Sequence, residues 1–171
     1  MSRNLVLVAI LALAIAGIGY ASINASKYNE VSSLSGIEVP TRVTVRGEVV
    51  NLGFSKLVMV YNGIVYDMDA RGVYAVAESR TTQDSYAVFL LKGKNGFTVA
   101  AVYPSAEFIS RYGGSPVIES SIVVDGIYKP GDRLKIVMPT GEQVELPVLE
   151  INSILKGCHS SYGQEQARIK G

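Results

Sequence analysis

The stretch TRVTVRGEVV, residues 41–50, decides the fold. Val43, Val45 and Val49 alternate there with polar residues in the period of two that a β-strand requires, and Gly47 predicts a bulge or bend. Similar short apolar runs, bounded by turn residues, follow along the chain. They comprise residues 57–61, 64–68, 73–77, 86–91, 97–103, 121–124, 133–137 and 144–155. Many short strands with glycine-marked bends favour a small closed barrel over a sandwich, so we expect an all-β protein with an OB-type β-barrel over residues 41–156.

Turn residues and one helical segment refine this expectation. Asn62-Gly63 is a strong two-residue hairpin signal, and Lys94-Asn95-Gly96 is another hairpin candidate. Pro147 interrupts the last apolar run, which predicts an edge strand or a bulge there. The segment Pro104 to Tyr112 is the one plausible helix after residue 40.

The amino-terminal segment has the length and composition of a membrane anchor. No charged residue occurs between Arg3 and Lys27, and residues 5–18 are only Leu, Val, Ala, Ile and Gly. As a helix, the uncharged stretch would reach about 35 Å, against about 30 Å of bilayer hydrocarbon. We therefore expect a transmembrane helix within residues 1–26. A cleaved secretory signal is the alternative, because small residues around 19–25 resemble cleavage sites.

Either alternative places the rest of the chain outside the cytoplasm. Arg3 and the amino terminus are positive, whereas Lys27 and Glu30 cancel on the other flank. The expected location is the cell membrane, with a single span, a cytoplasmic amino terminus and an extracytoplasmic carboxyl-terminal domain. Residues 22–40 are rich in Ser, Asn and Gly, so residues 27–40 are expected to be a loosely ordered linker that holds this domain off the membrane.

The chemistry-bearing residues gather near the carboxyl end. Cys158 is the only cysteine, His159 is the only histidine, and Tyr162 follows four positions after the cysteine. Their polar neighbours predict an exposed, flexible tail over residues 157–171. A lone extracytoplasmic cysteine is buried and inert, free for chemistry, or paired in an intermolecular disulfide. A tyrosine phenolate can ligate haem iron, and positions four apart can face the same way on a strand or on a helical turn.

The sequence Leu155-Lys-Gly-Cys-His-Ser-Ser-Tyr162 resembles the end of the CcmE family, the haem chaperones of cytochrome c maturation, in its Cys-x-x-x-Tyr variant. Residues 45–49, 97–108 and 121–126 are similar to the strands and helical turn of that family, whereas residues 57–85 depart from it. The resemblance implies covalent haem attachment at Cys158 and an axial bond from Tyr162 to the haem iron. His159 is then a possible auxiliary acid or base.

The same resemblance implies a carrier and not an enzyme. Its partners would be haem, the membrane, the haem-loading and haem-ligating proteins of the maturation system, and apocytochrome c. The net charge of +1 without a basic, aromatic-rich stripe gives no support for nucleic-acid binding. Three alternatives remain: a membrane-tethered OB-type interaction or assembly module without haem, a single-cysteine cytochrome with Leu155 in place of the first cysteine, and a thiol redox protein whose resolving cysteine comes from another chain.

Overall fold

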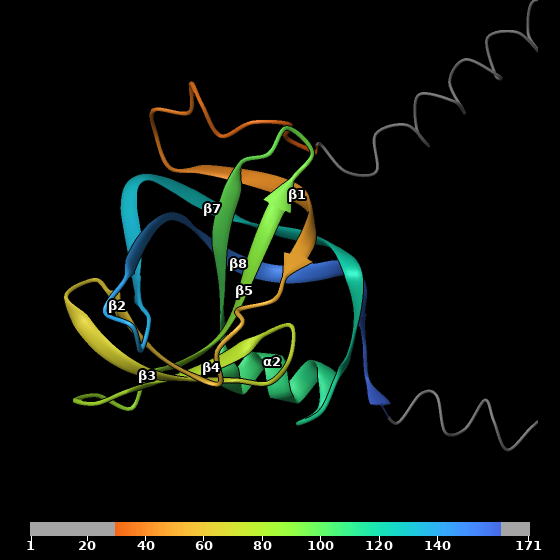
Figure 1. The fold of residues 1–171 in the computed structure, drawn as a ribbon. Coiled ribbons are helices and arrows are strands. Elements are labelled where there is room, and N and C mark those ends of the chain that lie inside the picture. The colour runs from red at the N-terminus through yellow and green to blue at the C-terminus, as the bar shows by residue number, and fades with distance from the viewer. Residues whose placement is uncertain (1–29, 162–171) are drawn as a thin grey trace, which may run out of the picture.

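The computed structural model describes residues 30–161, which form eight strands and one short helix (Figure 1). The elements are β1 (Thr41–Val50), β2 (Lys56–Tyr61), β3 (Ile64–Ala70), β4 (Ala75–Ser79), β5 (Ser85–Gly93), β6 (Thr98–Pro104), α2 (Ser105–Tyr112), β7 (Val117–Val137) and β8 (Gln143–His159). The expected all-β class is confirmed. The predicted anchor over residues 1–26 lies outside the described residues, and within the described range no helix has the length and apolar character to cross a membrane.

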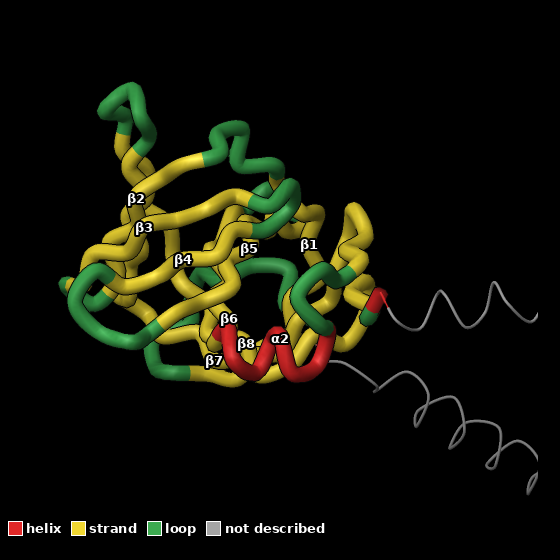
Figure 2. The backbone as a smooth tube through the Cα atoms, turned by 90° about the horizontal axis from the view of Figure 1, so that it is seen from below, coloured by secondary structure: helices red, strands yellow, loops and turns green. Residues whose placement is uncertain are grey.

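Five strands close into a ring. β1 pairs with β5 on one side and with β7 on the other, and β5 continues to β6, which lies parallel to β8, which in turn pairs with β7. The helix α2 connects β6 to β7 and lies against the strands in Figure 2. The strands of the first ring are staggered. If the β1–β5 register is extended by one residue, Asn51 lies opposite Phe89. The paired residues then lead from Phe89 through β6, β8 and β7 back to Thr41 on β1, about ten residues before Asn51.

A second ring of strands is built on the first. Strands β2, β3 and β4 pair in succession, and they join β7 at one end and β5 at the other. Strands β5, β6, β7 and β8 therefore take part in both rings. The segment 57–85, which departs from the family resemblance, supplies the additional wall of this second ring.

Alternating side chains of the shared strands fill two separate cores. On β6, Val99, Ala101 and Tyr103 belong to one buried cluster, whereas Ala100 and Val102 belong to the other. Successive side chains of a strand point to opposite faces, so a strand between two cores must be apolar at every position. This explains why residues 99–103 contain no charged residue and no Ser, Thr, Asn or Gln.

The predicted local features are confirmed. Asn62-Gly63 forms the β2–β3 turn with φ values of +50° and +74°, as a two-residue hairpin requires. The turn at residues 94–96 joins β5 to β6, and the predicted helix is α2. Pro147 pairs with Arg133 next to a register shift between β7 and β8, which agrees with the predicted bulge.

Two expectations are corrected. The runs 121–124 and 133–137 are parts of one long strand, β7, which pairs first with β1 and then with β2 and bends at an irregularity between Tyr128 and Arg133. Residues 30–40 are not a loose linker. Leu34 is buried in the core of the first ring, and the Val31 amide donates to the Thr44 carbonyl oxygen at 2.8 Å.

Candidate functional site

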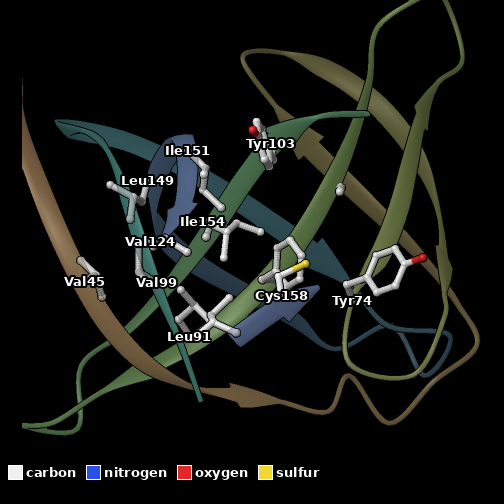
Figure 3. Packing of buried hydrophobic residues seen from close by; sticks show 14 of the residues in the cluster. Val45, Tyr74, Leu91, Val99, Tyr103, Val124, Leu149, Ile151, Ile154 and Cys158 are labelled. Atoms are coloured by element: carbon white, nitrogen blue, oxygen red, sulfur yellow. The ribbon is translucent and has the colours of Figure 1, made fainter. Parts of the chain in front are cut away.

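Cys158 lies in the last strand and not in an exposed tail. Residues 157–159 belong to β8, and the Cys158 side chain joins the core cluster of the first ring with only 8% of the residue exposed (Figure 3). Its expected exposure is therefore wrong for the described structure. Polar sequence neighbours predicted exposure, but alternation along a strand allows Cys158 to face inward while His159 faces solvent.

Burial changes the chemistry of the Cys158 thiol. Loss of solvation raises its pKa from 9.0 to about 11, because an ionised sulfur is disfavoured in apolar surroundings. The thiol forms no disulfide. Since the thiolate is the reactive form, Cys158 in the closed structure behaves as a small core residue.

The end of β8 is nevertheless joined weakly to the rest of the sheet. Beyond Lys156, only Cys158 and His159 pair with β7, opposite Ile118 and Val117, and a register irregularity separates these pairs from the next one. Gly157 lies at this irregularity with a φ of +83°. A Cβ atom there would stand 2.4 Å from the Ser121 carbonyl oxygen, so the close approach requires glycine.

Two tyrosines hold the free edge of β8 near the thiol. The Tyr112 hydroxyl donates to the Ile154 carbonyl oxygen at 3.1 Å, and the Tyr103 hydroxyl donates to that of Asn152 at 3.4 Å. Burial is the main cause of the raised pKa of both phenols, and the charge that Cys158 would carry adds to it. Neither residue stands out in the sequence, because the chain has ten tyrosines and no local pattern distinguishes these two.

His159 points away from this buried region. Its Nε2 atom lies 2.9 Å from a carboxylate oxygen of Glu119 on β7, and both side chains are more than half exposed. Tyr162 lies outside the described residues, so the predicted pairing of Cys158 with Tyr162 is not described. Among residues 30–161, no group of three His, Cys, Asp or Glu side chains is arranged to hold a metal ion.

Exposed apolar side chains occur near this end of the ring. Val117, opposite His159, is 37% exposed, and Ile109, one helical turn before Tyr112, is 52% exposed. Ile118 and Tyr112 are partly buried against the cluster that contains Cys158. Exposed apolar side chains are therefore present on β7, where it pairs with the end of β8, and on α2.

The fold and the site define an all-β protein with two fused rings and one shielded thiol at the end of its last strand. No family model, no curated protein and no solved structure matches the chain.

Proposed function

We propose that this chain is a membrane-anchored, extracytoplasmic haem chaperone of cytochrome c maturation, which holds haem through Cys158 and Tyr162 and delivers it to apocytochrome c. One observation carries the proposal: the strand that ends in Cys158-His159 is the last strand of a closed five-strand ring. The helix after the third ring strand is what the family resemblance implies, and the parallel contact between the third and fifth ring strands fits the proposed OB-type barrel.

Haem is cargo here, and the exposed apolar side chains of β7 and α2 would suit a flat apolar molecule. Val117 and Ile109 offer exposed apolar surface of the kind that a porphyrin face needs. The thiol of Cys158 can add across a haem vinyl group: a sulfur–carbon bond forms and the thiol proton goes to the neighbouring vinyl carbon, so no external oxidant or reductant is consumed. Tyr162 would supply the axial oxygen ligand to the iron.

Attachment requires the end of β8 to open. Residues 154–159 can separate from β7 while the β7–β8 ladder from Gln143 to Ser153 stays in place. This opening breaks the Tyr112 hydrogen bond to the Ile154 carbonyl oxygen and leaves the Tyr103 contact with Asn152 intact. Opening exposes the Cys158 thiol to solvent and returns its pKa towards the ordinary value. His159, already at the surface, would then be next to the thiol as an auxiliary base.

The experiment compares the full chain in detergent with Cys158→Ala, His159→Ala and Tyr162→Phe after incubation with haem. Ser160→Ala is the matched control in the same motif. We expect haem to survive denaturing electrophoresis in every variant except Cys158→Ala, with a mass gain of one haem, and we expect Tyr162→Phe to change the absorption spectrum. If the unaltered chain binds no haem, the carrier function is wrong.

A second candidate is a membrane-tethered OB-type assembly module without haem. The burial of Cys158 favours it, because a core cysteine is not offered to any ligand in the closed structure. Cross-linking of the full chain in its native membrane separates the two functions. An assembly module keeps its protein partners in the Cys158→Ala variant, whereas a haem carrier loses those that recognise the loaded form.

A further inference from the structure

A shallow basic groove crosses the outer surface of β1, β5 and β7. It has a volume of about 510 Å³, and its lining includes Arg46, Lys92, Lys94 and Ser121. Lys156 belongs to the same surface. Arg46 on β1 and Lys156 on β8 pair with Val123 of β7 from opposite sides, and directly paired residues share one face of a sheet. With Glu48 and Glu30 as the nearby carboxylates, this basic face has four cations against two anions.

The described chain begins on this basic face. Arg46 Nη2 lies 2.9 Å from a carboxylate oxygen of Glu30. The hydrogen bond from Arg46 is the largest cause that lowers the pKa of Glu30, and Lys156 and Lys94 act in the same direction. Figure 1 likewise shows the first described residues next to the β5–β6 turn that carries Lys94. Residue 30 is therefore fixed beside the groove.

The sequence leaves little distance between this face and the proposed anchor. Only residues 27–29 separate the uncharged segment from Glu30. Even fully extended, the four steps from residue 26 to residue 30 cover about 14 Å, and the lipid headgroup layer is itself roughly 5–8 Å thick. The lysines around Glu30 then stand within about one Debye length, roughly 8 Å, of the headgroups.

We propose that the domain docks onto its own membrane through the basic face formed by Arg46, Lys92, Lys94 and Lys156, with anionic lipid headgroups in the groove. The inference rests on the anchor in the proposed function. A basic side chain near an anionic bilayer strengthens binding about fivefold. The tether supplies the high local lipid concentration that makes such a weak surface effective.

Docking would place the motif at the bilayer surface. Lys156 directly precedes Gly157 and Cys158 on β8. Ser121, which lines the groove, has its carbonyl oxygen next to Gly157. A domain held by this face therefore keeps the end of β8 close to the membrane. Membrane proteins that load or accept cargo at Cys158 would meet it there.

The test uses the full chain in lipid nanodiscs, with Cys158→Ser and one fluorescent label on an introduced cysteine. Asn95→Cys, in the exposed turn after Lys94, reports on the basic face, and Thr140→Cys, in the exposed β7–β8 turn, is the control position. Headgroup-linked quencher lipids measure how close each label lies to the bilayer. We expect stronger quenching at Asn95→Cys than at Thr140→Cys when phosphatidylglycerol is present, and the difference should fall in pure phosphatidylcholine and in high salt.

Charge variants make the test specific. Lys92→Gln with Lys94→Gln should lower the docked-to-free ratio by about 25-fold, because two basic side chains are lost. Arg133→Gln with Lys135→Gln removes two cations on β7 away from this face and should leave quenching unchanged. Equal quenching in both lipids, with the chain retained in the nanodiscs in high salt, would overturn the docking alone. Failure of the chain to enter phosphatidylcholine nanodiscs would overturn the anchor, and the docking with it.

Discussion

The alkylation rate of Cys158 measures how firmly the end of β8 is closed. At about pH 8, we expect the folded chain to react with iodoacetamide at least 100-fold more slowly than the unfolded chain. The pKa of the thiol is raised from 9.0 to about 11 by burial, and two pKa units lower the reactive thiolate fraction by about 100-fold. Exclusion of the reagent from a residue that is 8% exposed slows the reaction further.

Tyr112→Phe should loosen this closure. The substitution removes the 3.1 Å hydrogen bond to the Ile154 carbonyl oxygen, a net loss of about 1 kcal/mol, so the open form should be about fivefold more populated and alkylation about fivefold faster. Tyr103→Phe is the matched control. Its hydroxyl lies 3.4 Å from the Asn152 carbonyl oxygen, a longer contact two residues further from Cys158, so we expect less than about a twofold effect.

Mass spectrometry of quenched time points gives both rates from one full-length sample. A folded chain that reacts as fast as the unfolded chain would refute the closed strand end. Equal acceleration by Tyr112→Phe and Tyr103→Phe would refute the argument that the Tyr112 hydrogen bond controls opening.

Three further predictions concern stability, each measured by chemical unfolding. Because folding raises the pKa of Cys158, the folded state holds the thiol proton more tightly; the contribution of this group to stability should be complete below about pH 9 and fall as the pH rises towards 11, and Cys158→Ala should remove that part of the pH dependence. Gly157→Ala should be more destabilising than Gly131→Ala. Both introduce roughly 1–3 kcal/mol of left-handed backbone strain, but of these two added Cβ atoms only the one at position 157 also meets a backbone oxygen. Asp125→Ala should lower the unfolding free energy, since it removes the hydrogen bonds from Arg42 to a carboxylate that is only 10% exposed; an unchanged unfolding free energy would show that this pair contributes nothing.

Local signals predicted the features that depend on local chemistry. Asn62-Gly63 can adopt positive φ values, and residues 104–112 combine an amino-terminal proline with helix-compatible residues, so both were found from the sequence. The burial of Cys158 was not found, because it depends on how β7 and β8 pair around Gly157, far apart in the chain. The burial of Leu34 has the same character, since Val31, Leu34 and Ile37 are spaced three apart and lack the period of two that predicts a strand. The second ring had a readable signal in the uninterrupted apolar runs at residues 86–91 and 99–103, which indicate strands buried on both faces.

The carrier function and the closed thiol are compatible only if one opening serves both. In the closed form, the high pKa and the burial of Cys158 prevent reaction with adventitious electrophiles, which protects a single cysteine that has no partner thiol in its chain. Haem attachment and alkylation then draw on the same open population, so a change in that population must alter both rates by the same factor. Tyr112→Phe should therefore accelerate haem attachment about fivefold alongside alkylation. Faster alkylation with unchanged haem attachment would mean that haem does not reach the chain through the opening of β8, and the assembly-module function would then be the better supported of the two.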